Sequence, residues 1–140
     1  MSVAKITDIP PAVPGLFTLP PYDMCPPMLL GGFCQVCNRY YFPRPRYCRV
    51  CLGEVVETTL GSKGTIYCFT VVLRKAPLGL PNPYGVGYVD LTESGLRIFG
   101  LLDPAAIGRI QIGMRVRLAV APLGDDGHGS PRLRPYFTPV

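Results

Sequence analysis

The stretch CQVCNRYYFPRPRYCRVC, residues 34–51, decides the fold of the first half of this polypeptide. Its four cysteines form two Cys-x-x-Cys pairs separated by ten residues, Cys34 with Cys37 and Cys48 with Cys51. Each pair can form a tight turn whose two sulfurs face one point, and two such turns joined by a hairpin complete a tetrahedral site of four thiolates. The spacing therefore predicts a metal-binding ribbon over residues 34–54.

The expected ion is zinc, although iron in a rubredoxin-like site would have the same geometry. Because all four ligands are cysteines, no position stays open for water, and the ion is expected to be structural rather than catalytic. Disulfide bonds are the alternative, but they would need an oxidising compartment, and residues 1–14 do not have the pattern of a signal peptide. We therefore expect a cytoplasmic protein.

Residues 1–33, on the N-terminal side of the ribbon, contain seven prolines. Proline removes an amide donor and disfavours helix in the residue before it, so this segment is predicted to be an extended or irregular arm. Apolar residues such as Leu16, Phe17 and Leu29 indicate that the arm lies on a surface, because a free tail would leave them in water. That surface belongs to the body of this protein or to a partner; a mobile tail is the alternative.

Residues 55–140, on the other side of the ribbon, combine β-branched and aromatic residues with frequent turns, which predicts a β-rich domain. The expected strands cover residues 55–60, 64–74, 84–91, 96–102, 115–121 and 133–138. Asp103 can cap a one-turn helix over Pro104–Gly108, and Cys68 is expected to be a small core residue. A five-stranded barrel interrupted by a small helix is the pattern of the OB fold, with another small β-barrel or sandwich as the alternative.

The composition excludes several classes of protein. Of the 140 residues 17 are Pro and 16 are Gly, too many for a helical protein, while 48% hydrophobic and 16% charged residues exclude a disordered chain. No apolar run approaches the ~20 residues of a membrane-spanning helix. The single histidine, His128, lies in a Gly-rich loop, and no nucleophile elbow, P-loop or dinucleotide-binding motif occurs. The sequence therefore indicates a binding or accessory role.

Basic residues near the cysteines are candidates to contact a ligand or a partner. The formal net charge is +5, and four arginines lie in or beside the cysteine stretch: Arg39, Arg44, Arg46 and Arg49. They could bind a phosphate-rich ligand or an acidic partner; the alternative is that they offset the charge of the thiolates. Nucleic acid is not the expected ligand, because Lys is scarce, Trp is absent and the strands are predicted to carry few paired basic and aromatic residues.

The loop at residues 76–83, APLGLPNP, is stiff and apolar. Its Leu78 and Leu80 are candidates to close over a partner or a bound ligand, and Lys75 just before it is a further candidate for a phosphate. The alternative is a loop that packs on the protein itself.

Five motifs carry a family resemblance: YFPR at 41–44, GTIYCFTVV at 64–72, PYGVGYVDL at 83–91, IGMRV at 112–116 and YFTP at 136–139. Together with the cysteine pairs they resemble the DUF35 family over residues 28–140. The resemblance implies a rubredoxin-like zinc ribbon followed by an OB fold. It further implies a non-catalytic partner of thiolase-superfamily enzymes, hydroxymethylglutaryl-CoA synthase, or certain enoyl-CoA hydratases and aldolases, usually encoded beside that enzyme. One feature departs from the family: its short charged helix before the ribbon cannot form over the prolines at 20–27.

We therefore expect a mainly β protein of three parts: an extended Pro-rich arm (1–33), a rubredoxin-like zinc ribbon (34–54) and a five-stranded OB barrel with one short helix (55–140). The resemblance implies an accessory subunit that docks on a thiolase in a hetero-oligomer and helps to shape its channel for the acyl-CoA thioester. The subunit of an enoyl-CoA hydratase or aldolase complex, and a nucleic-acid-binding module, are the alternatives. The acyl group and the stoichiometry stay open at this point.

Overall fold

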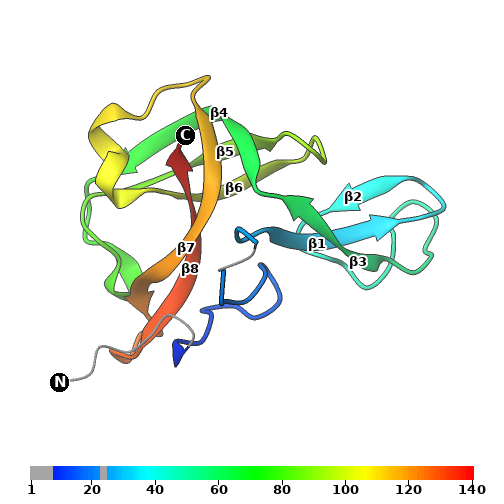
Figure 1. Ribbon diagram of the computed structural model, residues 1–140, viewed down its shortest axis with the longest axis horizontal. Coiled ribbons are helices and arrows are strands. Elements are labelled where there is room, and N and C mark those ends of the chain that lie inside the picture. The colour runs from blue at the N-terminus through cyan, green and yellow to red at the C-terminus, as the bar shows by residue number, and fades with distance from the viewer. Residues whose placement is uncertain (1–7, 23–24) are drawn as a thin grey trace.

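A computed structural model describes residues 8–22 and 25–140, and within them the chain is mainly β, as the sequence predicts. The described residues do not include 1–7 and 23–24. Both ranges belong to the expected arm, and residues 1–7 are also part of the stretch considered for a signal peptide. A three-stranded sheet projects to one side of a closed five-stranded barrel (Figure 1). None of the described helices is long and apolar enough to cross a membrane.

The three-stranded sheet has the order β2–β1–β3 and carries the cysteine pairs at its outer end. Its central strand β1 (Leu29–Cys34) pairs antiparallel with β2 (Arg39–Tyr41) and with β3 (Val56–Gly61). The sheet thus takes its centre from the end of the expected arm and one outer strand from the start of the expected barrel segment. It extends beyond residues 34–54 on both sides.

Two adjacent glycines explain how β1 can be the central strand. A Cβ on Gly31 would lie 2.6 Å from the Leu60 side chain, and a Cβ on Gly32 would lie 2.7 Å from the Arg44 side chain. Glycine therefore lets the neighbouring strand and the loop after β2 approach closely.

The barrel has the strand order β4–β5–β6–β8–β7, with β7 pairing with β4 to close it and β6 running parallel to β8. Its strands are β4 (Lys63–Val72), β5 (Tyr84–Leu91), β6 (Arg97–Leu102), β7 (Arg115–Asp125) and β8 (Pro131–Pro139). The 3-10 helix η3 (Pro104–Arg109) separates β6 from β7, and the Asp103 carboxylate accepts a hydrogen bond from the Ala105 N–H at its start. The closed barrel and its short helix confirm the expected OB architecture. A second 3-10 turn, η2 (Pro77–Gly79), was not predicted.

The described part of the arm lies on the protein's own body, one of the two surfaces that the sequence allowed. The Leu133 N–H donates to the Pro10 carbonyl and the Ala12 N–H donates to the Leu133 carbonyl, both at 2.9 Å. Further along the arm, Phe17 pairs with Leu29 of β1 and is only 2% exposed. The arm therefore connects β8 of the barrel to the three-stranded sheet.

A β-bulge in β4 overturns one prediction. Ile66 pairs with Val89 whereas Cys68 pairs with Tyr88, so Tyr67 is the additional residue. A bulge of one residue reverses the alternation of side chains along a strand. Cys68 is consequently half-buried opposite the exposed Tyr88, and its prediction as a core residue is wrong.

The main core joins the barrel to the root of the three-stranded sheet. Leu29 and Leu60 of the sheet are 2% and 1% exposed, and they belong to the same buried cluster as Ile66, Leu102 and Phe137 of the barrel. The direction in which the sheet projects is therefore set by shared packing rather than by a linker.

We expect Gly32→Ala to lower the free energy of unfolding by about 1–3 kcal/mol, because the added methyl group overlaps the Arg44 and Val55 side chains. Gly108→Ala is the matched control: nothing lies within 4 Å of its Cβ position, so its effect should stay within about 0.5 kcal/mol. Urea denaturation of the purified variants measures both changes. Equal stability of the two variants would contradict the close packing around β1.

Candidate metal centre and neighbouring surfaces

The two cysteine pairs form turns of similar shape, the first knuckle over Cys34–Cys37 and the second knuckle over Cys48–Cys51. Each knuckle is followed directly by a residue in the left-handed region, Asn38 with φ 52° and Leu52 with φ 61°. Such a residue reverses the chain immediately after the second cysteine. The same local geometry thus occurs on both sides of the candidate site.

Backbone amides point at the sulfurs from within each knuckle. The Cys37 N–H donates to the Cys34 sulfur at 3.5 Å, and the Val50 N–H donates to the Cys48 sulfur at 3.4 Å. Donors of this kind stabilise thiolates, the form of cysteine that binds metals.

The four sulfurs, all free of disulfide bonds, lie within 4.8 Å of one another. The Cys34 and Cys51 sulfurs are 3.5 Å apart and the Cys37 and Cys48 sulfurs are 4.0 Å apart. A tetrahedron of Zn–S bonds of about 2.3 Å places its sulfurs roughly 3.8 Å apart, whereas a disulfide needs about 2.05 Å. The geometry therefore fits a four-coordinate metal ion, which would cross-link the two knuckles and offer no open position to a substrate.

Tyr41 of β2 extends this arrangement, because its hydroxyl lies 3.1 Å from the Cys48 sulfur. This hydrogen bond, together with backbone donors, lowers the pKa of Cys48 to about 6. The pKa of Cys37 is raised to about 12, first by its hydrogen bond with Cys51 and then by burial. Metal binding requires four thiolates, so it must displace the protons that remain on these sulfurs and is favoured as the pH rises.

Two of the four candidate arginines share one cleft. Arg39 of β2 and Arg49 of the second knuckle line a cavity of about 400 Å³ between the sheet and the β5–β6 turn, together with Tyr40 and Ser94. Neither guanidinium forms an ion pair within the part of the chain that the structure describes. This cleft therefore offers two uncompensated positive charges.

The other two candidate arginines lie in a different setting. Arg44 and Arg46 line a cavity of about 550 Å³ that also contains Glu54 and Glu57. The negative charges of the two carboxylates make this cavity less favourable for an anionic ligand. The four arginines predicted as one group are thus divided between two clefts.

The remaining candidates lie on the side of the barrel away from the three-stranded sheet, in the β4–β5 loop (Figure 1). Lys75 is exposed, Leu78 is 45% exposed and Leu80 is half-buried. The loop packs on the β7–β8 turn, where a Cβ on Gly124 would lie 3.1 Å from the Leu80 side chain. The structure therefore supports a loop that packs on the protein itself, and it does not bring these residues to the arginine clefts.

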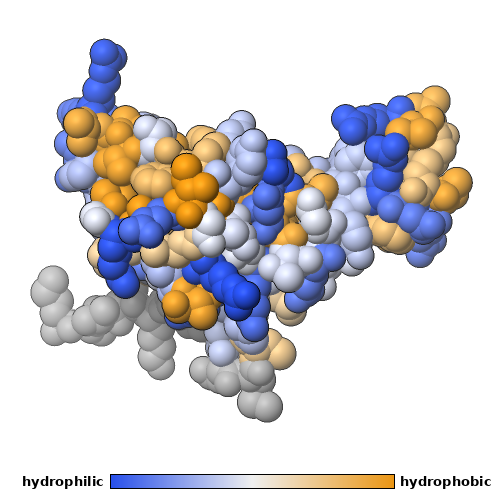
Figure 2. Space-filling view, turned by 90° about the horizontal axis from the view of Figure 1, so that it is seen from above, coloured by the Kyte–Doolittle hydropathy of each residue, from blue (hydrophilic) through white to orange (hydrophobic). Residues whose placement is uncertain are grey.

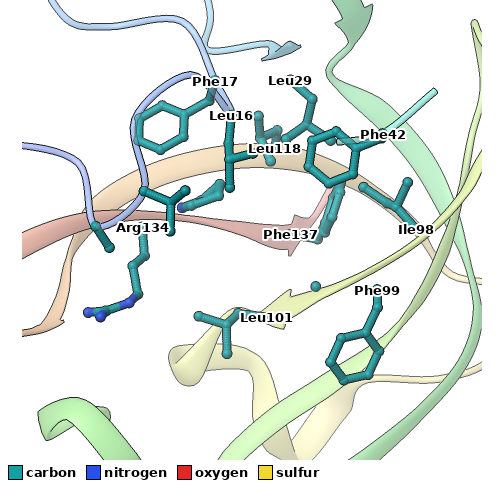
Figure 3. A pocket seen from close by; sticks show the side chains of 14 residues that line it. Leu16, Phe17, Leu29, Phe42, Ile98, Phe99, Leu101, Leu118, Arg134 and Phe137 are labelled. Atoms are coloured by element: carbon teal, nitrogen blue, oxygen red, sulfur yellow. The ribbon is translucent and has the colours of Figure 1, made fainter. Parts of the chain in front are cut away.

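An apolar groove that the sequence did not reveal lies where the arm, the sheet and the barrel meet (Figure 3). Its volume is about 220 Å³, and its walls include Phe17 of the arm, Phe42 after β2, Phe99 of β6 and Phe137 of β8. These residues come from four separate segments, so no local pattern of the sequence could have indicated the groove.

Exposed aromatic side chains gather on the outer face of β4, β5 and β6. Tyr88 and Phe99 form an edge-to-face pair with ring centroids 5.3 Å apart, and the Arg97 guanidinium lies 3.4 Å from the centre of the Tyr67 ring. Arg97 with Tyr67 is the one cation–π pair on strands within the described residues, so the expectation of few paired basic and aromatic residues there agrees with the structure. Arg97 is itself neutralised by Asp90, whose carboxylate accepts from it at 2.7 Å.

The described residues contain no cluster suited to acid–base catalysis. His128 lies in an exposed turn, where its backbone N–H donates to Asp126. Asp90 is paired with Arg97, and Asp103 both caps η3 and accepts a hydrogen bond from Thr138 at 2.7 Å. These carboxylates stabilise the structure.

The chain is similar to known proteins over most of its length. A family model described as the C-terminal OB-fold domain of ChsH2 matches residues 57–121. The benzoylsuccinyl-CoA thiolase subunit BbsA of Thauera aromatica is 33% identical over 121 residues, which cover 86% of this chain and 82% of BbsA. A chain in the solved structure of the Ltp2-ChsH2(DUF35) aldolase matches with a TM-score of 0.65 and 26% identity, covering 80% of this chain and 84% of that chain. Matches of this extent include the three-stranded sheet as well as the barrel.

We expect the purified protein to hold close to one equivalent of zinc or iron per chain, and Cys48→Ser to lose the ion and unfold at lower temperature. Cys25→Ser is the matched control, because Cys25 is exposed and lies outside the sulfur cluster. Elemental analysis and thermal denaturation measure the two effects. Freshly purified, fully folded protein without any metal would contradict the assignment.

Proposed function

This chain belongs to the DUF35 family, and on that basis we propose that it is a non-catalytic accessory subunit of an enzyme complex that processes acyl-CoA thioesters. The observation that carries the proposal is the match to BbsA, a thiolase subunit, across 86% of this chain and 82% of that subunit. The similar solved structure, that of an aldolase, also contains a DUF35 chain. The similarity of this chain both to a thiolase subunit and to the DUF35 chain of an aldolase supports a role in assembly with a catalytic chain.

The chemistry of the described residues agrees with such a role. The four cysteine sulfurs lie close enough to hold a metal ion, Asp90 and Asp103 are used in an ion pair and a helix cap, and the single histidine lies in an exposed turn. Exposed apolar groups and uncompensated arginines remain, and these are the groups that bind partners and anionic ligands.

We further propose a thiolase as the catalytic partner, since the relative at 33% identity is a thiolase subunit whereas the aldolase chain is 26% identical. The reaction class would be thiolytic cleavage or formation of a 3-oxoacyl-CoA. Within that complex, the cleft of Arg39 and Arg49 suits a phosphate of CoA better than the cleft of Arg44 and Arg46. The reason is that Glu54 and Glu57 line the second cleft and oppose an anion there.

For the sulfur cluster we propose zinc as the resident ion. Four thiolates also suit iron, and the separations of 3.5 and 4.0 Å between sulfur atoms are compatible with either metal. The ion's proposed role is to hold the knuckles in place while the neighbouring side chains meet the partner.

We expect the chain to co-purify with the catalytic subunit encoded beside its gene when the two are expressed together. The complex should cleave a 3-oxoacyl-CoA in the presence of free CoA, whereas this chain alone should show no turnover. Size-exclusion chromatography and a thiolysis assay that follows loss of the 3-oxoacyl-CoA measure the two results. A chain that leaves the solubility and the activity of that subunit unchanged would refute the proposal.

Within the active complex, we expect the double variant Arg39→Gln/Arg49→Gln to raise the KM for CoA at least about fivefold, because charge-assisted hydrogen bonds to a phosphate are lost. The kcat should change less, since the phosphates of CoA do not react. Arg109→Gln/Arg115→Gln is the matched control, because both residues are exposed on the barrel and absent from this cleft. An unchanged KM in the first variant would exclude the cleft as a CoA contact.

A further inference from the structure

The outer end of the three-stranded sheet carries three apolar side chains that we call the knuckle tip: Val36, Val50 and Leu52. They are 78%, 57% and 76% exposed. Val36 and Val50 occupy the same position in the two knuckles, each directly before the second cysteine. Figure 2 shows the corresponding apolar surface at the far end of the projecting lobe, bordered by hydrophilic groups. Apolar groups thus surround the metal centre on its solvent side.

Leu52 gives the strongest indication that this surface has a use. Its φ of 61° lies in the left-handed region, which Gly and Asn adopt readily and a Leu side chain disfavours. The equivalent residue after the first knuckle is Asn38, the residue type expected there. Packing inside the chain does little to offset this unfavourable conformation, because Leu52 is 76% exposed. A strained, exposed apolar residue points to a contact outside the chain.

Leu78 provides a comparison within the same molecule. It also has a positive φ, 55°, but it is less exposed, at 45%, and its side chain lies 3.5 Å from the Cβ position of Gly127 in the β7–β8 turn. Leu78 therefore gains packing within its own chain, whereas Leu52 needs a partner to gain it.

The knuckle tip is rigid and has a basic rim. The sulfur cluster fixes both knuckles, so little conformational entropy is lost when the tip is buried against another surface. Arg46 lies above the Tyr47 ring at 5.5 Å. Glu54 and Glu57 line the same cleft, but neither forms an ion pair with Arg46 among the described residues. The Arg46 charge is therefore available to a carboxylate of a partner.

A second copy of this chain fits the tip poorly. A symmetric dimer would place each tip against the same patch of its partner and would bring the two basic rims close together. Like charges opposed across an interface are unfavourable. The basic rim therefore selects a different protein, one that presents an apolar pocket bordered by Asp or Glu side chains.

We propose that the knuckle tip is the surface by which this subunit docks into such an apolar, acid-rimmed pocket of its catalytic partner. This inference rests on the proposed function and adds the contact surface to it. Val36, Val50 and Leu52 enter the pocket, and Arg46 pairs with a carboxylate at its edge.

Leu52→Asn is the decisive variant, because Asn suits a positive φ and should leave the metal content and the thermal stability unchanged or improved. We expect it to raise the Kd of the complex with the co-purified catalytic subunit at least tenfold, and Val36→Ser to act in the same direction. Ile112→Asn is the matched control, since Ile112 is 70% exposed but lies between η3 and β7 of the barrel, outside the knuckles. Its Kd should equal that of the wild type. Isothermal titration calorimetry with purified subunits measures each value.

The charged rim has its own readout. Arg46→Gln should slow association and reduce the dependence of Kd on salt, because surface charges act mainly on the rate of encounter. If the wild type binds the catalytic subunit and Leu52→Asn and Val36→Ser bind it with the same Kd, the knuckle tip is not the docking surface. The proposed function would still stand in that case. Absence of association in the wild type would instead refute the proposed function. A chain that dimerises alone through Leu52, seen by analytical ultracentrifugation, would also overturn the inference.

Discussion

Convergence of four sulfurs at the outer end of the three-stranded sheet is the constraint on which the rest of that sheet depends. The strand β2 has three residues and makes three pairs with β1, which is too little for a stable hairpin in water. The buried cluster of this region consists of Cys34, Cys48 and Val55. Two of its three buried members are therefore candidate ligands, so a bound ion stabilises the region far more than its own apolar packing can.

Side-chain packing connects the sheet that carries the sulfur cluster to the barrel. β1 begins at Leu29 and β3 contains Leu60, and both side chains lie in the core shared with the barrel. The arm adds a second connection, because it bonds to Leu133 of β8 and pairs through Phe17 with β1. The shared core and the arm together hold the sheet in one orientation, and a bound ion would add a cross-link at its outer end. The side chains around the knuckles therefore keep a fixed direction, which would lower the entropic cost of association with a partner.

The features that the sequence predicts are those determined by local residues. The cysteine spacing predicts the cluster, the strand over 84–91 agrees with β5, and Asp103 with Pro104 predicts η3. The features that it misses depend on contacts between distant segments. β1 is hidden because Gly31 and Gly32 are poor strand formers in isolation, and their use appears only once β2 and β3 close in on them. The apolar groove and the separation of the four arginines into two clefts likewise require the assembled fold.

The distribution of charge separates binding from catalysis in this molecule. Asp90, Asp103 and Asp126 are engaged with Arg97, with η3 and with Arg132, so these acids are used within the chain. Arg39 and Arg49 have no such partner among the described residues. The cations beside the sulfur cluster therefore stay available to an anionic ligand or partner. Four thiolates around a divalent ion would carry a net charge of about −2, which would offset part of this cationic charge. Arg39, Arg49 and the exposed apolar side chains Val36, Val50 and Leu52 thus stay available beside the sulfur cluster, where a bound ion would limit the entropy lost on binding a partner.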